Sequence, residues 1–336
     1  MPEKITILGD GAMATVCSIL LTSGGHGVTM WGAFEESIER LLQDREQTRL
    51  LPGVSVPPQV RLTANDADAF AGATMILSAI PTQYMRSAWE RLRPHVPEGV
   101  PVVSVAKGIE NGTLLRPTQI VADMVDGFTR NPLAALSGPN IAAEISKYLP
   151  ATAVAAADDA SLAQRVQAAF STQWFRVYTN NDVTGVELAG ASKNVIAIAA
   201  GILEGLAAGN NAKAALVTRG IVEITRLGVA MGAQASTFAG LAGLGDLITT
   251  CISPESRNRT VGERIGKGQK LEQILGTMDS VAEGVPTTKS VMQLARRHGV
   301  DMPITEGVHA VLFEGKDAID ALTGLMTREP KPEWGE

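Results

Sequence analysis

A lysine lies in the middle of one of the least polar stretches of the chain. The segment ELAGASKNVIAIAAGI (187–202) is almost wholly apolar and small, yet it contains Lys193 and Asn194. In a helix, Ala189 and Ala197 share the face of Lys193. A lysine on such a face either extends out to solvent or is buried beside a counter-charge. Burial lowers the pKa of an ammonium group and makes it usable as a general acid or base.

A second lysine follows a short apolar run. Lys107 comes directly after VPVVSVA (100–106), which is typical of a buried strand, and precedes Gly108. In an open α/β sheet, ligands bind in the crevice at the carboxyl ends of the strands. Lys107 is therefore a candidate ligand contact, although a surface lysine in a turn is an equally good interpretation.

The turn after the next strand candidate has the same form. The run PLAALSG ends at Gly138, and Pro139 and Asn140 follow it. We expect Asn140 to cap a helix, because its side-chain oxygen can accept from free helix N–H groups. A contact with a bound cofactor is the alternative role of this turn.

A carboxylate and a cluster of hydrogen-bond donors stand in the second half of the chain. Asp246 follows the glycine-rich stretch GLAGLG, and the string SRNR further on comprises Ser256, Arg257, Asn258 and Arg259. Arginine together with hydroxyl and amide donors suits a phosphate group. A solvated loop is the alternative interpretation of this cluster.

The beginning of the chain carries a glycine-rich turn. In ITILGDGAMATVCSILL, Gly9, Gly11 and Ala14 have the spacing G-x-G-x-x-A, between a strand candidate (4–9) and a helical pattern. The first glycine permits a tight turn, the second lets the backbone approach a pyrophosphate, and the small third residue allows close helix packing. We therefore predict a dinucleotide site here, with a glycine turn that binds no ligand as the alternative.

The residues after the second strand candidate bear on the type of dinucleotide. An acidic residue near this place usually binds the adenosine ribose, whereas an arginine accepts a 2′-phosphate. Glu35 and Glu36 are present, and the nearest arginine is Arg40. The cofactor is therefore expected to be NAD or NADP, with a preference for NAD. Alternatively, the two glutamates simply face solvent in the first turn of a helix, where negative charge is favourable.

Composition limits the class of protein. The chain has 336 residues, enough for about two domains, and a net charge of −6, which does not favour a nucleic-acid partner. Only 4% of residues are aromatic, and abundant Ala and Gly favour closely packed helices. Cys17 and Cys251 are too few for a disulfide framework, and we expect both to be buried and no metal site to be present.

No targeting or membrane segment is expected. The opening MPEKITILGDG has no long apolar stretch after its basic residue, unlike a secretory signal. The helix around Lys193 is long enough to cross a membrane, but its Glu, Lys, Asn and Gly residues favour a buried helix of a water-soluble domain.

Two kinds of element must position these residues. Strand-rich runs alternate with helical patterns up to about Thr179, and this alternation predicts a mostly parallel sheet with helices on both faces. From Asp182 onward the patterns are helical. The helices expected there span 211–231, 243–250, 271–275, 285–298 and 304–313. The predicted fold is therefore α/β, with a Rossmann-type, mostly parallel sheet domain over residues 1–180 and an all-α domain over residues 181–336.

Several well-separated strings resemble those of the NAD(P)-dependent glycerol-3-phosphate dehydrogenase family. The resemblance covers nearly the whole chain. Its strings are the glycine turn, LPGV (51–54), AKGIE (106–110), GPNIAAEI (138–145), ASKNVIAIAAGI (191–202), NAKAALVTRGIVEITRLG (211–228), TFAGLAGLGDLITTC (237–251) and SRNR (256–259). The turn alone is unspecific, whereas the strings of the second half, in this order, are highly specific.

The resemblance implies a function and a set of partners. It implies a cytoplasmic homodimer that reversibly reduces dihydroxyacetone phosphate to sn-glycerol 3-phosphate, which feeds phospholipid synthesis. Its implied partner is this phosphorylated small molecule, with neither nucleic acid nor a membrane involved. Two rival interpretations remain: another two-domain hydroxy-acid or sugar-acid dehydrogenase, and an NAD(P)-sensing protein without catalysis.

The resemblance also implies roles for individual residues. Lys193 corresponds to the family's catalytic lysine, and Lys107 and Asp246 are implied to assist it. The implied substrate-binding residues are Lys107, Gly138, Asn140, Lys193, Asn194, Asp246, Ser256, Arg257 and Asn258. The implied cofactor-binding residues are Gly9, Gly11, Ala12, Met13, Phe34, Lys107, Ala142, Arg257, Val281 and Glu283.

The glycine turn departs from the pattern of bacterial members of the family. Ala12 and Met13 stand where those chains usually carry Ser and an aromatic residue, so Met13 can pack on a cofactor but cannot stack like a ring. Asp10 stands where a small neutral residue is common. A carboxylate there repels a pyrophosphate unless it points away.

Overall fold

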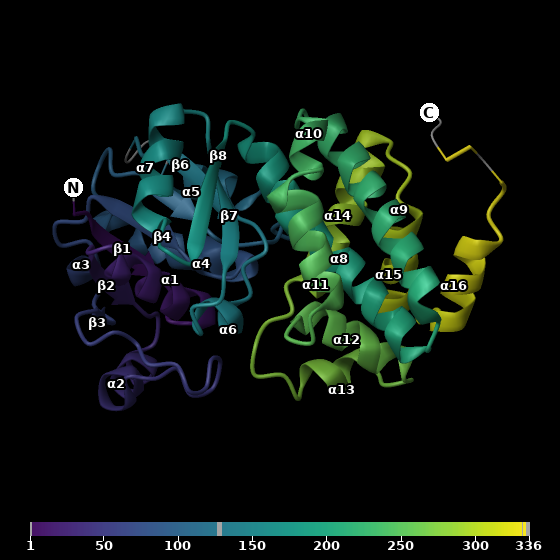
Figure 1. Cartoon of the computed structure of the whole chain (residues 1–336), viewed down its shortest axis with the longest axis horizontal. Helices are drawn as coiled ribbons and strands as arrows, with labels where there is room; N and C mark the ends of the chain where they lie inside the picture. Colours follow the sequence, from purple (N-terminus) through teal and green to yellow (C-terminus); the bar gives the residue numbers. More distant parts are fainter. Residues whose placement is uncertain (1, 126–129, 331, 334–336) are drawn as a thin grey trace.

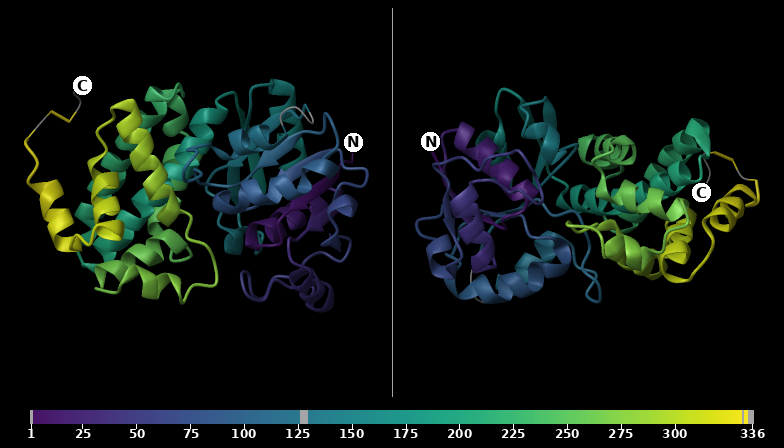
Figure 2. Two further views of the ribbon diagram at one scale, coloured as in Figure 1. Left: turned by 180° about the vertical axis from the view of Figure 1, so that it is seen from behind. Right: turned by 90° about the horizontal axis from the view of Figure 1, so that it is seen from below.

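The computed structural model describes residues 2–125, 130–330 and 332–333. It has two lobes, one built around a sheet and one built of helices (Figure 1). The views from behind and from below show the lobes side by side, joined through a narrow middle (Figure 2). The predicted fold class, a Rossmann-type sheet domain followed by an all-α domain, is confirmed.

The sheet has eight strands over the described residues, in the order β3-β2-β1-β4-β5-β6-β7-β8. The strands are β1 (Lys4–Leu8), β2 (Gly27–Trp31), β3 (Arg61–Thr63), β4 (Met75–Ser78), β5 (Val102–Ser104), β6 (Leu133–Ser137), β7 (Ala151–Ala157) and β8 (Phe175–Asn180). Only β6 and β7 pair antiparallel among them. The sheet is therefore mostly parallel as predicted, with the short β3 as an element that the sequence did not indicate.

Helices cover both faces of the sheet. They are α1 (Ala12–Ser23), α2 (Glu35–Asp44), α3 (Asp66–Ala69), α4 (Thr82–Leu92), a short 3₁₀ turn (Arg93–His95), α5 (Pro117–Val125), α6 (Ala142–Ile145) and α7 (Ala160–Phe170). Ile7 of β1 packs in a core that includes residues of α1 and α7, whereas the next residue, Leu8, packs in a core with α4 and α5. Alternation of side chains along each strand thus creates one apolar core on each face.

The helical lobe is built around α8. Its helices are α8 (Val183–Gly205), α9 (Gly209–Ala230), α10 (Ala235–Phe238), α11 (Asp246–Ile252), α12 (Arg257–Gly266), α13 (Leu271–Leu275), α14 (Gly284–His298), α15 (Pro303–Phe313) and α16 (Ala318–Met326). A π-helical turn, Leu241–Gly245, leads into α11. Because α9, α11, α12, α14 and α15 all pack on α8, that helix is buried along nearly its whole length (Figure 1).

Glycines let α12 lie directly on the backbone of α8. A Cβ atom added to Gly201 of α8 would lie 1.9 Å from the carbonyl oxygen of Arg259. One added to Gly262 of α12 would lie 1.9 Å from the carbonyl oxygen of Ile198. No side chain fits at either position, so the close packing expected from the Ala and Gly content is found at this helix pair.

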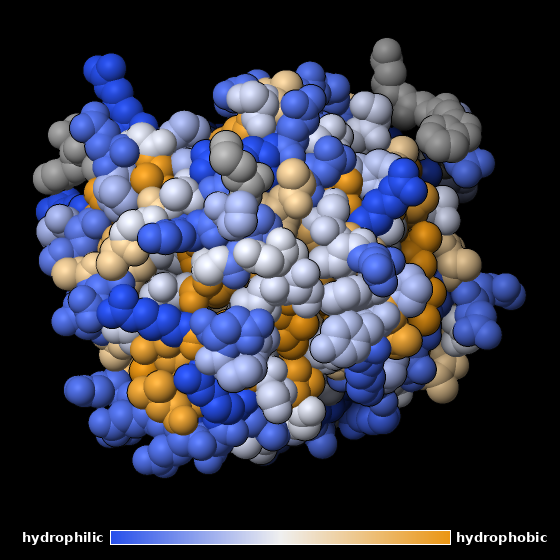
Figure 3. Space-filling model, turned by 60° about the vertical axis from the view of Figure 1, so that its left-hand side comes forward, coloured by the Kyte–Doolittle hydropathy of each residue, from blue (hydrophilic) through white to orange (hydrophobic). Residues whose placement is uncertain are grey.

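Within the described residues, two helical stretches are long and apolar enough, by length and composition, to cross a membrane: Val183–Gly205 and Ala235–Ile252. The apolar window of the first is 100% buried inside the protein, as in the core helix of a globular domain. Seen from the side of the sheet lobe, hydrophilic residues dominate the surface, and the hydrophobic ones form separate patches rather than a continuous band (Figure 3).

Candidate active site

Lys193 is buried in the middle of α8, with 5% of its surface exposed. Its Nζ donates to Asp246 Oδ1 at 2.7 Å and to Thr250 Oγ1 at 2.5 Å. Of the two alternatives that the sequence left open for this lysine, burial beside a counter-charge is therefore the one found.

Lys107 reaches the same carboxylate from the sheet lobe. Its Nζ donates to Asp246 Oδ2 at 2.7 Å, to Asn140 Oδ1 at 2.6 Å and to the carbonyl oxygen of Gly138 at 3.0 Å. The alternative of a surface lysine in a turn is thus wrong. Asp246 lies between two ammonium groups, each bound to one of its oxygens.

The elements explain how these residues meet. Lys107 follows β5, and Gly138 and Asn140 follow β6, the parallel neighbour of β5, so both segments lie at the carboxyl ends of strands. Gly138 has φ +147°, and a Cβ there would lie 2.9 Å from the carbonyl oxygen of Thr152. This turn requires glycine, and it brings the following residues to the lysines.

The prediction that Asn140 caps a helix is wrong. The residue at the capping position of α6 is Ile141, and no side chain makes a capping hydrogen bond there. The side-chain oxygen of Asn140 instead accepts from Lys107 Nζ at 2.6 Å, so it is occupied by the ammonium group. Asn140 is therefore part of the lysine cluster.

Burial lowers the pKa of Lys193 to about 8. Loss of water around the ammonium is the main cause, and the charge of Lys107 lowers the pKa further. The carboxylate of Asp246 acts in the opposite direction and keeps the pKa from falling more. A lysine in this range can exchange a proton at neutral to mildly alkaline pH.

Thr250 belongs to the cluster, although the sequence analysis did not select it. Its hydroxyl accepts from Lys193 and donates to the carbonyl oxygen of Asp246 at 2.6 Å. Asp246 and Thr250 are four positions apart on α11 and so lie on the same helix face. That spacing is the signal that could have identified it.

Two asparagines hold main-chain segments around the lysines. Asn194 Nδ2 donates to the carbonyl oxygen of Lys107 at 2.9 Å, which ties α8 to the sheet lobe. Asn258 is buried, and its Oδ1 accepts from the N–H of Gly284 at 2.9 Å, at the beginning of α14. Each side chain therefore uses one of its two polar atoms to bind the main chain.

The SRNR string forms the amino end of α12 rather than a loop. Ser256 is the capping residue, and its hydroxyl accepts from the N–H of Arg259 at 3.3 Å. Arg257 is exposed at the first position of the helix. An exposed guanidinium beside free N–H groups at a helix amino end is suited to bind a phosphate.

The glycine turn after β1 has the geometry of a pyrophosphate site. Gly9 has φ +119°, and a Cβ there would lie 2.9 Å from the carbonyl oxygen of Ala79, so only glycine fits. Gly11 precedes α1, whose amino end has no side-chain cap, and Ala12 and Met13 form its half-buried first turn. Uncapped N–H groups at the start of this 12-residue helix fit an anionic group.

The remaining predicted cofactor contacts lie at other strand and helix ends. Phe34 precedes α2 and is 74% exposed, which leaves its ring free to contact a ligand. Glu283 Oε1 accepts from the N–H of Thr82 at 2.8 Å, at the start of α4, which follows β4. Ala142 is the first residue of α6, and Val281 is half-buried before α14.

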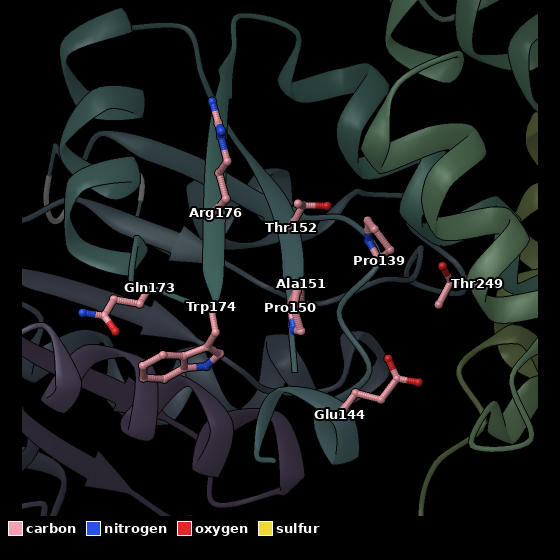
Figure 4. Close-up of a pocket in the computed structure, with 9 residues that line it drawn as sticks. All are labelled: Pro139, Glu144, Pro150, Ala151, Thr152, Gln173, Trp174, Arg176 and Thr249. Atoms are coloured by element: carbon pink, nitrogen blue, oxygen red, sulfur yellow. The ribbon is translucent and has the colours of Figure 1, made fainter. Parts of the chain in front are cut away.

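A cavity of about 360 Å³ lies beside the site but is not part of it. Its lining comes mainly from β7, β8 and the segments before them, as the labelled side chains in Figure 4 show. From the segments of the lysine cluster it takes only Pro139 and Thr249, and neither lysine lines it. We therefore place the chemistry at the lysine cluster.

Reduction of a carbonyl by a dinucleotide requires a site for the pyrophosphate and a proton donor near the carboxyl ends of the strands. This chain has both: a pyrophosphate turn after the first strand and a buried lysine facing those strand ends. The fold and the site thus define a two-domain, dinucleotide-dependent oxidoreductase. Comparison with known proteins narrows this class. Residues 4–163 match the model for the N-terminus of NAD-dependent glycerol-3-phosphate dehydrogenase, and residues 182–323 match the model for its C-terminus.

Whole-chain comparisons agree. The chain is 48% identical to glycerol-3-phosphate dehydrogenase [NAD(P)+] 2 of Salinibacter ruber, covering 99% of this chain and 97% of that one. It is 47% identical to glycerol-3-phosphate dehydrogenase [NAD(P)+] of Citrifermentans bemidjiense, covering 99% of both. The crystal structure of glycerol-3-phosphate dehydrogenase from Coxiella burnetii matches with a TM-score of 0.93 at 33% identity, over 97% of this chain and 99% of that one. The chain belongs to the NAD-dependent glycerol-3-phosphate dehydrogenase family, as the resemblance of its strings predicted.

Proposed function

We propose that the chain reversibly reduces dihydroxyacetone phosphate to sn-glycerol 3-phosphate and that Lys193 is the general acid. The observation that carries this proposal is the shared carboxylate: Lys193 and Lys107 each lie 2.7 Å from one oxygen of Asp246. This arrangement keeps a lysine of lowered pKa in a protonated, fixed position at the edge of the dinucleotide domain.

Some residues of the site transfer a proton, and others stabilise charge. A bound dinucleotide supplies the hydride that adds to the ketone carbon. Lys193 donates a proton to the ketone oxygen as negative charge develops there, and in the reverse direction the neutral amine removes it. Lys107 adds positive potential in a site with little water, and Asp246 orients both ammonium groups.

The amino end of α12 would hold the phosphate of the substrate. Ser256 and Arg257 stand there, and neither side chain donates a hydrogen bond within the part of the chain that the structure describes. Asn258 anchors this end of α12 to the beginning of α14. Since α12 lies on α8 through glycine contacts, the distance between the phosphate site and Lys193 is fixed by main-chain packing. Fixed positions of this kind contribute to the rate by orienting the ketone.

The dinucleotide would lie along the carboxyl ends of the strands. The residues we assign to it are Gly9, Gly11, Ala12, Met13, Phe34, Lys107, Ala142, Arg257, Val281 and Glu283. Further proposals rest on the family resemblance: a homodimer in the cytoplasm that supplies glycerol 3-phosphate for phospholipid synthesis. We also propose the domain boundary between residue 180, the last residue of β8, and residue 181, which lies before α8.

The test is oxidation of NADH or NADPH that depends on dihydroxyacetone phosphate. A panel of keto acids under the same conditions tests the rival hydroxy-acid dehydrogenase, and binding of a dinucleotide without turnover would indicate a sensing protein. The variant Lys193→Ala should bind the dinucleotide but lose turnover by about 10²- to 10⁴-fold. Lys213→Ala, on α9, is the matched control and should keep its turnover. Near-normal turnover of Lys193→Ala would remove the general-acid assignment.

A further inference from the structure

Asp10 lies inside the pyrophosphate turn, but its carboxylate is directed elsewhere. Its Oδ2 accepts from the Ser37 hydroxyl of α2 at 2.5 Å. A Cβ added to Gly32, which follows β2, would lie 2.9 Å from the same oxygen. The carboxylate therefore lies at the end of β2 and the first turn of α2, rather than over the amino end of α1.

The end of β2 is the place where doubly wound folds hold the adenosine ribose of a dinucleotide. The sequence suggested Glu35 or Glu36 for this contact. Both are exposed in the first turn of α2, as the alternative interpretation of them stated. Asp10 is half-buried and held in place by Ser37, so it is the better-positioned carboxylate.

The hydrogen-bonding capacity of Asp10 is only partly used. In the described part of the chain, Oδ1 of Asp10 has no hydrogen-bond partner, whereas Oδ2 is bound to Ser37. The main-chain oxygen of Asp10 accepts from Gln47 Nε2 at 2.5 Å, which fixes the turn itself. A carboxylate in this state can still accept hydrogen bonds from a ribose hydroxyl.

The cations near this place do not neutralise Asp10. Arg91 lies over the ring of Trp31 and donates to the carbonyl oxygen of Ala33, but its charge is paired with Asp66 through two bonds of 2.7 Å. Arg40 is exposed and donates to a main-chain oxygen of its own helix. Among the described residues, Asp10 forms no ion pair. A phosphate placed here would meet an uncompensated negative charge.

We propose that Asp10 makes the chain select NAD over NADP. Its carboxylate accepts a hydrogen bond from the 2′-hydroxyl of the adenosine ribose and repels a 2′-phosphate, while Ser37 holds it in position. This inference rests on the dinucleotide site of the proposed function and assigns the selectivity to a residue of the glycine turn rather than to the glutamates after β2.

Measuring dinucleotide binding directly, without turnover, separates the selection of NAD by Asp10 from any effect on catalysis. We would titrate NADH, NADPH and 2′,5′-ADP by calorimetry into the full-length protein and into Asp10→Asn, which keeps the size of the side chain and removes its charge. The wild type should bind NADH at least about tenfold more tightly than NADPH, and Asp10→Asn should bind NADPH and 2′,5′-ADP about tenfold more tightly than the wild type does. Ser37→Ala, which frees the carboxylate but keeps its charge, should reduce the selectivity by a smaller factor.

Glu36→Gln is the matched control, because it removes a carboxylate from the same turn of α2 and should change each affinity by less than about twofold. Equal affinity of the wild type for NADH and NADPH would overturn the inference. So would an equal change in NADPH affinity in Asp10→Asn and Glu36→Gln. If the wild type binds neither dinucleotide, the proposed function fails and the inference fails with it. Thermal melting of each variant shows whether it is folded.

Discussion

Lys107 and Lys193 come from different lobes and share one carboxylate, with each ammonium 2.7 Å from an oxygen of Asp246. All three side chains are largely removed from water. One negative charge between two positive ones leaves the cluster with an excess of positive charge, which suits a substrate that carries a phosphate. The same arrangement sets the proton affinity of Lys193 and leads to two predictions about pH.

The first prediction concerns the pH dependence of ketone reduction. Reduction requires protonated Lys193, and its pKa is lowered to about 8. We therefore expect kcat/KM for dihydroxyacetone phosphate to fall as pH rises through about 8, and the oxidation of glycerol 3-phosphate to gain from the same rise. Steady-state rates in both directions between pH 6 and 10 test this, and a reduction profile that is flat to the alkaline end would contradict it.

The second prediction concerns Asp246→Asn. Removing this carboxylate takes away the charge that raises the pKa of Lys193 and leaves the repulsion from Lys107. The alkaline limit of the reduction profile should therefore move to lower pH, together with a loss of rate. Glu187→Gln is the control, because Glu187 is a buried carboxylate of α8 that binds Arg116 and Thr118 instead of the lysines. If the alkaline limit stays unchanged in Asp246→Asn, or moves equally in both variants, the charge of Asp246 does not set the pKa of Lys193.

The third prediction concerns the glycine contact between α8 and α12. In Gly262→Ala the new methyl group would lie 1.9 Å from the carbonyl oxygen of Ile198, so the helices must separate. We expect a loss of about 3 kcal/mol in the free energy of unfolding, measured with urea. Gly307→Ala is the control, since nothing lies within 4 Å of a Cβ there and alanine favours the helix, for an expected gain of about 0.5–1 kcal/mol. If both variants change the free energy of unfolding equally, the contact of Gly262 with the backbone of α8 is not tight.

The fourth prediction concerns Glu223, a buried carboxylate of α9. It accepts from the N–H groups of Ile304 and Thr305 at the start of α15. Burial raises its pKa from 4.5 to about 7. Between pH 4.5 and about 7, Glu223 is therefore protonated in the folded state and ionised in the unfolded state. The group therefore stabilises the fold relatively more at low pH, and this contribution is lost as pH rises towards about 7.

Glu223→Gln should abolish this pH-dependent part. The difference in free energy of unfolding between wild type and variant should change by about 3 kcal/mol between pH 4.5 and 7, measured by urea unfolding at several pH values. Glu306→Gln, an exposed glutamate in the first turn of α15, should leave the slope unchanged. A parallel pair of curves for wild type and Glu223→Gln would show that Glu223 titrates normally.

Patterns of apolar residues predicted most of the fold, because strand and helix periods are set by burial. The helix expected over 271–275 is found at those residues, and the one over 285–298 begins one residue earlier. The three-residue β3 gave no signal because, unlike the equally short β5, it does not lie within a longer apolar run. The start of α12 looked like a possible loop because SRNR is polar. The buried residues of α12 are Asn258, Val261 and Gly262, and the glycine lies against the backbone of α8.

The site was less accessible to sequence reasoning. The binding of both Lys193 and Lys107 to Asp246 depends on a π-helical turn before α11 and on the approach of two lobes, and neither has a local signature. Asn140 shows the limit most clearly. Its position after a turn is typical of a helix cap, yet an ammonium group from a distant segment competes for the same oxygen and binds it.

The segment after β5 follows a strand of the sheet but packs with the helical lobe. Ile109 follows β5, but its side chain is fully buried in the core of the helical lobe. Ser290 of α14 donates to its carbonyl oxygen at 3.1 Å, and Glu187 of α8 binds the N–H of Thr118 at 2.8 Å. The segment 107–118, which carries Lys107, is therefore held by α8 and α14 on one side, while Lys107 itself is bound to Gly138 and Asn140 of the sheet lobe. Because Ala135 of β6 and Val154 of β7 also pack with Val186 of α8, the two lysines and Asp246 lie in a region where both lobes share one apolar core.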